Sequence, residues 1–306
     1  RLPNKIFLKL NKITILKNIY LRLKKSKFLN GIIFLIPKNS KNLKLKHYLK
    51  SEKYNFFCGD EFNVLKRYFD ASKKFNPDLI VRVTADCPLV DYRLLDEMIN
   101  NFLKLENVDY FSNTIKRSYP DGLDIEIFTK NALNTTYKNT KKKYDLEHVT
   151  PYMQKNLKAH NYMNDKDYSK LRWTLDTIED YNKLNNMYDK FKLKTSSSWK
   201  KILHNENSYV LIGKNTTIGF NSIIISSERI EIGTDCMIAP NVYIGDSNHG
   251  MSPGLPFNQQ ENVVSAILIE DNVWIGAHSI ILPGVKIVSG SIVGANSTVT
   301  SSILEQ

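Results

Sequence analysis

One stretch of this 306-residue sequence, GDSNHGMSPG (245–254), brings together side chains suited to acid–base chemistry. His249 carries an imidazole, the side chain best suited to take a proton near neutral pH. Asp246 stands three residues before it, and either this carboxylate or a backbone carbonyl could orient the ring. The stretch therefore predicts a general base in the C-terminal part of the chain.

Two carboxylates in the N-terminal part suggest a different chemistry. Asp86 follows the apolar run LIVRV (79–83), and Asp176 ends the strand-like run LRWTLD (171–176). Mg²⁺ commonly takes one or two protein carboxylates and fills its other positions with phosphate oxygens and water. We therefore expect the two carboxylates to lie within about 8 Å of each other, on one metal-bound polyphosphate.

The histidine lies within a region of regular six-residue spacing. A period of six fits neither an α-helix nor a flat alternating strand, but it fits a parallel β-helix whose coils have three short sides. Three series of aliphatic residues have this spacing. The first is Ile212, Ile218, Ile224 and Ile230, and the second begins two residues later, after a slip in the rhythm, with Ile232, Ile238 and Ile244. The third is Ile269, Ile275, Ile281, Ile287, Val293 and Val299.

The slip predicts a bulge or short insertion near 225–231, and the rhythm breaks off again over 245–268. This second break contains Pro253 and Pro256, so we expect a loop thrown out from the β-helix with His249 at its root.

The repeat region resembles the hexapeptide-repeat acyltransferases, specifically the O-acetyltransferases that act on galactosides, maltose and polysaccharides. The motifs that carry the resemblance are IGTDCMIAPNVYIGDSNHG (232–250) and ILIEDNVWIGAHSIILPGVKIVSGSIVGANSTVTSSI (267–303). It implies a left-handed β-helix, a homotrimer with active sites between subunits, and acetyl-CoA as donor. It also implies that His249 is the catalytic base and that Asn241 helps to hold the acceptor or the oxyanion.

The same resemblance implies that the pantetheine arm of CoA lies along small residues of the coils. Trp274, Gly276, Ala277 and Ala295 are the candidates. Tight packing at coil corners would call for such residues without any ligand, so both interpretations stay open.

The N-terminal two-thirds of the chain lacks the six-residue repeat and has a different pattern of apolar residues. Apolar runs such as IIFLIP (32–37) alternate with helical patterns over 14–26 and 60–75, which predicts an α/β domain with a largely parallel sheet. In such sheets ligands bind beyond the carboxyl ends of the strands.

This part resembles the sugar cytidylyltransferases, the group that includes spore-coat polysaccharide proteins and the enzymes that activate acylneuraminate and keto-deoxy-octulosonate. Its fold is accordingly expected to be a Rossmann-like nucleotidyltransferase domain. The resemblance rests on an ordered series of motifs: RLPNK (1–5), GDEFNVLKRY (59–68), VRVTADCPLVD (81–91), SN (112–113), PDGLDIEIF (120–128), EHVTPY (147–152) and LRWTLDTIED (171–180).

The resemblance implies that Asp86 and Asp176 hold Mg²⁺ and that Arg1 and Lys5 grip the triphosphate of CTP. Asp176 could instead cap the helix that begins near Thr177. The residues implied on the sugar side are Asp124, Glu126, Glu147 and His148. The sequence departs from the family at its start, because the family's first strand and most of its phosphate loop precede the segment RLPNK. We therefore expect the first domain to lack that strand.

Composition narrows the class of protein. The net charge of +12 belongs to the first part of the chain, since from residue 205 onward nine acids face three bases. No nucleic-acid motif accompanies the charge, no apolar run is long enough to span a membrane, and three cysteines without metal or redox spacing fit a cytoplasmic protein.

We expect a cytidylyltransferase-like domain over 1–191, a linker over 192–207 without helical rhythm, and a β-helix over 208–306. The combination predicts a bifunctional enzyme of surface-glycan or nonulosonic-acid biosynthesis that acts on a small-molecule sugar or sugar nucleotide. The alternative is a trimeric acetyltransferase or scaffold whose first domain only binds sugar or nucleotide.

Overall fold

The computed structural model describes residues 2–39, 42–257, 260 and 262–305. The chain separates into two compact units, residues 1–199 and 200–306, and each is described by itself. The described helices include none that is long and apolar enough to cross a membrane.

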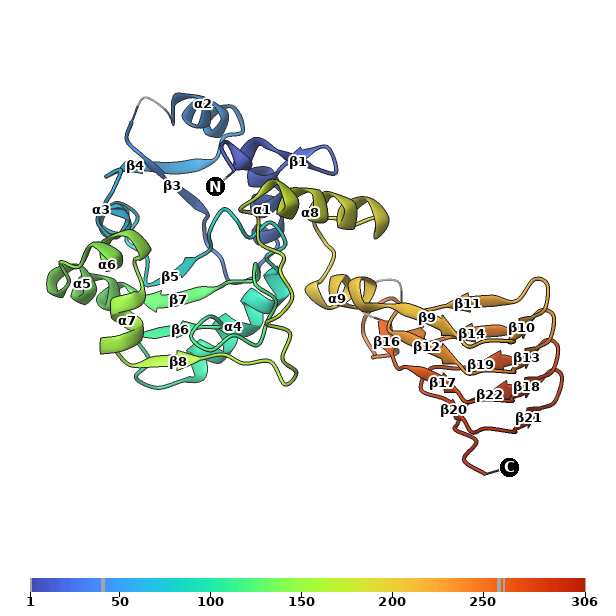
Figure 1. Cartoon of the computed structure of the whole chain (residues 1–306). Coiled ribbons are helices and arrows are strands. Elements are labelled where there is room, and N and C mark those ends of the chain that lie inside the picture. The colour runs from blue at the N-terminus through green and yellow to red at the C-terminus, as the bar shows by residue number, and fades with distance from the viewer. Residues whose placement is uncertain (1, 40–41, 258–259, 261, 306) are drawn as a thin grey trace. The chain divides into compact units, whose positions relative to one another are not determined.

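The first unit is built on a four-stranded sheet with the order β5-β7-β6-β8 (Figure 1). Its strands are β5 (Leu79–Arg82), β6 (Tyr110–Ser112), β7 (Glu126–Thr129) and β8 (Ala159–Asn161). β6 and β8 are parallel, but β7 runs antiparallel to both β5 and β6. Three of these four strands therefore run in one direction, as expected for a largely parallel sheet, and the exception is β7, which carries Glu126 and enters the sheet in reverse.

Two smaller sheets complete the strands of this unit. β3 (Ile33–Pro37) pairs in parallel with β4 (Asn55–Gly59), and β1 (Lys9–Leu10) forms a hairpin with β2 (Ile13–Thr14). The short 3₁₀ helix η1 (Lys5–Phe7) leads into that hairpin. β3 and β5 each have one hydrogen-bonded strand partner among the described residues, so each leaves one edge unpaired.

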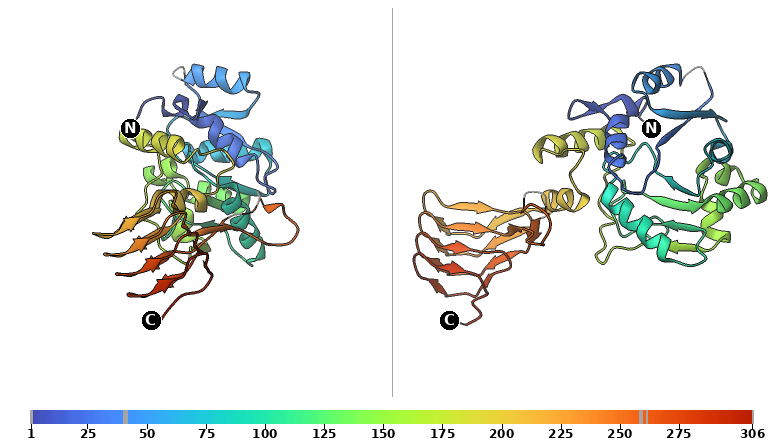
Figure 2. Two further views of the ribbon diagram at one scale, coloured as in Figure 1. Left: turned by 90° about the vertical axis from the view of Figure 1, so that its right-hand side faces the viewer. Right: turned by 180° about the vertical axis from the view of Figure 1, so that it is seen from behind.

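Helices cover the sheets from opposite sides, with α3, α5, α6 and α7 on one side and α1 and α4 on the other (Figures 1 and 2). The helices of the unit are α1 (Ile15–Leu23), α2 (Leu43–Ser51), α3 (Val64–Phe75), α4 (Tyr92–Lys104), α5 (Lys130–Asn139), α6 (Lys143–His148), α7 (Pro151–Asn156) and α8 (Ile178–Lys190).

One hydrophobic cluster joins the helices to the central strands. Leu65 of α3, Leu133 of α5 and Met153 of α7 pack with Tyr110 of β6 and Phe128 of β7, and all five are fully buried. Removing this much apolar surface from water fixes the strands that end at the candidate site.

Two segments differ from the sequence-based expectation. Residues 171–176 form no strand, and a single bridge joins Arg172 to Asp121. The expected linker over 192–207 contains the helix α9 (Trp199–Asn207), in which Trp199, Ile202 and Leu203 are buried. These apolar side chains recur at helical spacing, so the expectation that this segment has no helical rhythm was wrong.

The second unit contains three four-stranded parallel sheets, ordered β9-β12-β17-β20, β10-β13-β18-β21 and β11-β14-β19-β22. Successive strands along the chain belong to different sheets, so the backbone climbs as a three-sided parallel β-helix (Figure 2). Its strands are β9 (Tyr209–Ile212), β10 (Thr217–Ile218), β11 (Ile223–Ile225), β12 (Arg229–Ile232), β13 (Met237–Ile238), β14 (Tyr243–Gly245), β17 (Ile267–Ile269), β18 (Trp274–Ile275), β19 (Ile280–Ile281), β20 (Lys286–Ile287), β21 (Ile292–Val293) and β22 (Thr298–Val299).

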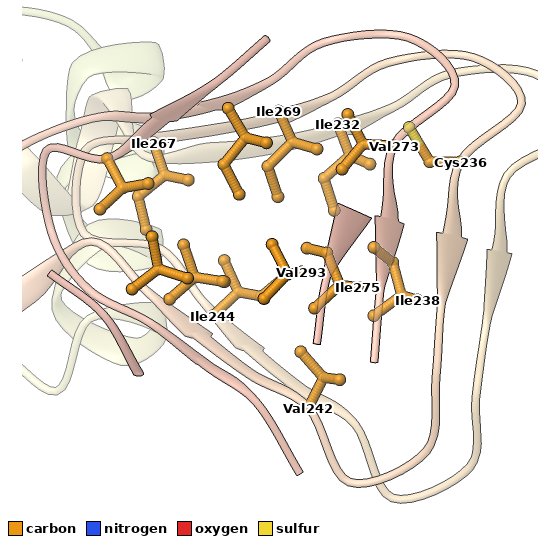
Figure 3. Packing of buried hydrophobic residues seen from close by; sticks show 14 of the residues in the cluster. Ile232, Cys236, Ile238, Val242, Ile244, Ile267, Ile269, Val273, Ile275 and Val293 are labelled. Atoms are coloured by element: carbon orange, nitrogen blue, oxygen red, sulfur yellow. The ribbon is translucent and has the colours of Figure 1, made fainter. Parts of the chain in front are cut away.

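The six-residue rhythm corresponds to side chains that point into the β-helix. Figure 3 shows Ile232, Ile238, Ile269 and Ile275 directed at the same interior, and all four are almost completely buried. The coils from Ile230 to Val299 thus bury their aliphatic residues against one another, as the repeat predicts, whereas Ile212 and Ile218 of the first coil are 43% and 39% exposed.

The corners between sides require an unusual backbone. Asn221, Asn241, His278 and Asn296 occupy one corner of successive coils with φ between 56° and 60°. Backbone hydrogen bonds link these corners to the preceding coil. Asn241 donates its N–H to Phe220 O, and His278 donates its N–H to Pro240 O. Asparagine tolerates this left-handed conformation better than most residues, which explains its repeated use here.

The break at 245–268 is more ordered than the expected loop. β15 (Ser247–His249) pairs antiparallel with β16 (Asn262–Val264), so that His249 stands opposite Asn262. The chain leaves the β-helix after β14 and returns at β17, and we call residues 247–264 the arm.

The structure predicts different costs for two glycine substitutions. A Cβ on Gly276 would lie 2.5 Å from the backbone N of Ala295 in the next coil, whereas a Cβ on Gly294 would meet only Ser297 Oγ at 3.7 Å. Gly276→Ala should therefore lower the free energy of unfolding by about 1–3 kcal/mol, as overpacking does.

Gly294→Ala is the matched control and should change the stability by less than about 1 kcal/mol. Urea unfolding of both variants, followed by circular dichroism, measures the difference. Equal stability of the two variants would show that the coils do not approach as closely as described.

Candidate functional site

The first candidate site forms where Asp86 and Asp176 meet. Lys5 Nζ lies 3.5 Å from an oxygen of Asp86 and 3.0 Å from an oxygen of Asp176. Two carboxylates that share one ammonium nitrogen at these distances are closer than the expected 8 Å, although 90 positions separate them in the sequence. Their predicted proximity is confirmed.

Backbone hydrogen bonds hold the two acids side by side. Leu175 donates its N–H to Asp86 O at 2.8 Å, and Trp173 donates to Asp121 O at 2.6 Å. Segment 171–176 is thereby fastened to one residue that follows β5 and to another that precedes β7. At the other end, Leu2 donates to Asp176 O at 2.8 Å, which brings the N-terminal segment and Lys5 to the same place.

Charged side chains orient Asp176 further. Arg172 Nη2 lies 3.3 Å from Asp176 Oδ2, and Nε and Nη2 each donate a hydrogen bond of 2.9 Å to the carboxylate of Asp180. Asp180 also closes the capping box of α8 with Thr177. The hydrogen bonds from Arg172 lower the pKa of Asp180 to about 2. Asp176 therefore precedes the capped helix, and the capping residue is Thr177 rather than Asp176.

The environment keeps Asp86 ionised. Burial would raise the pKa of this carboxyl, but hydrogen bonding from Thr84 and the charge of Lys5 outweigh it and leave the pKa below its usual range. A carboxylate that stays charged in a half-buried position is available to a cation.

The donor set fits a hard divalent cation that also binds phosphate. The described residues contain no group of three or more His, Cys, Asp or Glu side chains placed to hold a metal by themselves. Two carboxylates are nevertheless what Mg²⁺ takes when a polyphosphate supplies other ligands, and the ammonium of Lys5 shows that a cation is accommodated between them. Arg1 lies outside the described residues, so its expected role is not addressed here.

A cavity of about 310 Å³ brings together three of the four residues expected on the sugar side. Asp124, Glu126 and His148 line it, whereas Glu147 is exposed and does not. His148 ends α6 with its ring 4.4 Å from that of Tyr144, which also lines the cavity. Glu147 precedes it on the same helical turn and points elsewhere.

The acids of this cavity are held by arginines. Glu126 is buried and pairs with Arg82, and it accepts hydrogen bonds from Tyr110 Oη at 2.8 Å and Thr150 Oγ1 at 2.5 Å. Asp124 makes a bidentate pair with Arg117, with both bonds at 2.7 Å. Sequence reasoning assigned no role to either arginine. Arg82 could have been found from its place inside the apolar run LIVRV (79–83), because a charge in a buried strand needs a partner of opposite charge.

A second cavity of about 500 Å³ lies at the carboxyl ends of β3 and β4. Its lining includes Asp60, Glu61 and Lys66, all from the motif GDEFNVLKRY. Arg67 shapes this wall by donating to Asp60 O and Glu61 O. Ligands of open α/β sheets bind at strand ends of this kind.

The second candidate site is the arm of the β-helix. His249 is exposed on β15, and its imidazole has no hydrogen-bond partner among the described residues. It is therefore free to accept a proton from a bound molecule. Asn241 occupies a half-buried corner of the coil before the arm, and its role in catalysis stays a prediction.

Asp246 makes no hydrogen bond to the imidazole of His249, so the expectation that its carboxylate orients the ring by direct contact was wrong. Its side chain is fully buried and accepts hydrogen bonds from Ser226 Oγ and from the backbone N–H groups of Ser227, Glu228 and Arg229, at 2.6–2.9 Å. These donors point the carboxylate at the slip between β11 and β12. Sequence proximity to the histidine gave no hint of this direction.

Close packing between coils accounts for some of the residues that are expected to bind CoA, without any ligand. Gly276 is buried beneath Ala295, where a side chain would collide with backbone. Trp274 lies on the outer surface of β18 with 48% of its area exposed. Ala277 and Ala295 lie next to each other on neighbouring coils, since Asn296 donates its N–H to Ala277 O. The small residues leave backbone accessible along this corner, and their contact with CoA stays a prediction.

Comparison with protein families separates the chain in the same way. The family model described as cytidylyltransferase matches residues 1–215. Two models of hexapeptide repeats match the second part, a repeat of succinyl-transferase over 209–246 and a bacterial transferase hexapeptide over 266–301.

Individual relatives cover one part or the other. A solved cytidylyltransferase from Leptospira borgpetersenii is 36% identical, covers 66% of this chain and 87% of its own, and has a TM-score of 0.63. An uncharacterized protein of Methanocaldococcus jannaschii is 39% identical over 59% of this chain and 75% of its own length. The galactoside O-acetyltransferase of Escherichia coli is 40% identical over 31% of this chain, which spans 47% of that enzyme.

The network around Asp180 makes a testable difference to acid stability. Because its pKa is depressed in the folded state, Asp180 stabilises the fold above about pH 4 and loses that contribution as the pH falls toward 2. Asp180→Asn should lower the free energy of unfolding by about 1–2 kcal/mol at pH 7, as loss of a helix cap does, and by less at pH 3.

Asp189→Asn is the control, because Asp189 lies on the same helix, is exposed and bonds only Asn185. Urea titrations at both pH values give the comparison. A loss at pH 3 as large as that at pH 7 would contradict the assigned ionisation.

Proposed function

Because the chain belongs to the cytidylyltransferase family, and because hexapeptide repeats of the transferase type follow that domain, we propose that it is a bifunctional enzyme of surface-glycan biosynthesis. The first unit transfers CMP from CTP to a sugar. The second unit transfers acetyl from acetyl-CoA to a sugar hydroxyl. The observation that supports the first activity best is the meeting of Asp86 and Asp176 on one cation.

In the first reaction a sugar hydroxyl oxygen bonds to the α-phosphorus of CTP while the bond to the β-phosphate oxygen breaks. Pyrophosphate leaves, and the hydroxyl proton passes to solvent or to a nearby base. Asp86 and Asp176 would hold Mg²⁺, which would neutralise phosphate charge. Positioning by the protein accounts for most of the remaining rate, as is general for phosphoryl transfer.

Lys5 has two places to act in this scheme. In the structure its ammonium contacts both carboxylates and offsets part of their combined negative charge. If Asp86 and Asp176 held a divalent cation, the ammonium would have to leave this position, and the triphosphate would offer it another anionic partner. Lys5 would then lower the electrostatic cost of holding the two acids together in one state and bind phosphate in the other.

The cavity of about 310 Å³ is the proposed sugar pocket. Asp124 and Glu126 are held rigid by Arg117 and Arg82, so their free lone pairs can accept sugar hydroxyls without further ordering. His148 and Lys155 complete its lining with groups that carry no ion pair among the described residues.

Replacement of one metal-site acid tests the first activity. Asp86→Asn should remove Mn²⁺ binding measured by electron paramagnetic resonance in the presence of CTP and reduce pyrophosphate release by about 10²-fold or more. CoA release by the second unit should be unchanged.

Asp96→Asn serves as the control, since Asp96 lies on α4 and its carboxylate bonds Ser26 and Lys27. Both variants are compared at equal concentration of folded protein. Retention of Mn²⁺ binding in Asp86→Asn would remove the metal assignment.

In the second reaction His249 takes the proton of a sugar hydroxyl, whose oxygen attacks the thioester carbonyl. The C–S bond then breaks, and the imidazolium returns the proton to the CoA sulfur. Exposure of the ring on the arm and its freedom from internal hydrogen bonds support this role. Asn241 and the backbone beside Ala277 and Ala295 are the proposed supports for oxyanion and pantetheine.

Assembly as a left-handed β-helical trimer belongs to the same proposal. Met237, Trp274 and Ile292 form a column in register on the outside of one sheet, and each is 48–68% exposed. Ile223, Tyr243 and Ile280 form a second outer column on the neighbouring sheet. Two adjacent apolar columns on a small unit are suited to two partner copies, one on each side.

Removal of the imidazole tests the second activity. His249→Ala should lower kcat for CoA release by about 10²–10⁴-fold, the usual contribution of a general base. Because the side chain is exposed and supports no coil, the stability should change by less than about 0.5 kcal/mol. Light scattering of the same samples checks that the trimer is retained.

The control is His278→Ala, an exposed histidine at a coil corner, which should keep wild-type kcat. If His249→Ala retains more than about a tenth of the wild-type rate, His249 is not the base.

A further inference from the structure

The β-helix departs from its regular path at two points, and one buried carboxylate joins them. The first departure is the slip at residues 226–228, between β11 and β12, and the second is the arm. Asp246 is the last residue before the arm. Its side chain reaches back one coil to the slip and accepts four hydrogen bonds there, from Ser226 Oγ and the N–H groups of Ser227, Glu228 and Arg229.

The donors explain why this residue is an acid. Three consecutive backbone N–H groups converge on two oxygens, forming a concave anion-binding site of the kind that successive amides make in a turn. Each N–H donates to the buried carboxylate from a half-buried or exposed residue and would lose this partner without the acid. An amide side chain offers one oxygen and would turn its own N–H₂ toward the other donors, so it cannot replace the carboxylate.

The backbone of the same residue fixes both ends of the arm. Asp246 donates its N–H to Ile225 O, and Ser265 donates to Asp246 O at 2.9 Å. Ser227 and Ser247 join their hydroxyls at 3.1 Å across the two departures. β15 begins at the next residue, and His249 follows two residues later. The arm thus leaves and rejoins the β-helix beside Asp246, which is fully buried.

We propose that Asp246 is a positioning residue for His249: its carboxylate locks the slip at 226–229 to the root of the arm and so sets where the imidazole stands relative to the β-helix. This inference rests on the proposed function of His249 as base. Displacement of a reacting group by about 1 Å can cost 10²-fold in rate, so a loosened root is sufficient to impair transfer.

A second acid of the same unit provides a matched comparison. Asp271 Oδ1 accepts the N–H of Thr234 at 2.7 Å and so also joins neighbouring coils. It lies between β17 and β18, with no arm attached. A substitution there removes a carboxylate from a comparable contact between coils without touching the root of the arm.

The experiment compares Asp246→Asn and Asp271→Asn in the full chain. Two quantities are measured: kcat and KM for acetyl-CoA, and hydrogen exchange of the amides of residues 247–264 relative to those of residues 267–299. We expect Asp246→Asn to lower kcat by about 10²-fold with KM within about threefold of wild type, and to speed exchange in the arm. Asp271→Asn should leave kcat within about threefold and arm exchange unchanged.

Ser226→Ala removes one donor and keeps the acid, so it remains informative if Asp246→Asn fails to assemble. It should speed arm exchange while the trimer persists. Arm exchange equal to wild type in Ser226→Ala, or equal effects of the two acid variants on kcat, would overturn the proposal. If His249→Ala proves active while Asp246→Asn still loosens the arm, the base assignment fails and the anchoring by Asp246 stands.

Discussion

The extended segment 171–176 is the element on which the first site depends. Hydrogen bonds from Leu175 to Asp86 O and from Trp173 to Asp121 O hold it along residues that follow β5 and precede β7. Without this attachment Asp176 would have no fixed distance from Asp86. Trp173 and Leu175 are fully buried, so the hydrophobic effect fastens the same segment that presents the acid. The segment carries the second acid without being a strand.

In the second unit, residues are placed by the stacking of successive coils. In the first unit, they are placed by hydrogen bonds between segments that are far apart in the sequence. From Ile230 onward the inward aliphatic residues are buried against neighbouring coils, and the left-handed corners at Asn221, Asn241 and Asn296 let the backbone turn between sides. A regular stack of this kind has no obvious place for chemistry. The proposed base, His249, lies on the arm, where the stack is interrupted. Asp246 joins the start of the arm to the preceding coil through the N–H groups of Glu228 and Arg229.

The sequence predicted these features to different extents. The inward face of the β-helix was predictable from Ile269 to Val299, because a repeated local unit fixes its own geometry. The meeting of Asp86 with Asp176 followed from the resemblance, as did the grouping of Asp124, Glu126 and His148. The direction of Asp246 was not predictable, since its partners lie about 20 positions earlier and are backbone amides that leave no trace in side-chain type. The reversed strand β7 was missed for a similar reason. Apolar runs indicate a strand, but they do not indicate its direction.

A crystal structure of the full chain with CTP, Mn²⁺ and CoA tests the account most directly. The account predicts an anomalous Mn²⁺ peak at about 2.1 Å from carboxylate oxygens of Asp86 and Asp176, with Lys5 moved onto the triphosphate. It also predicts the CoA sulfur beside the imidazole of His249, in a groove between two copies of the chain. A nucleotide bound away from Asp86 and Asp176, or a thiol remote from every His249 of the assembly, would contradict it.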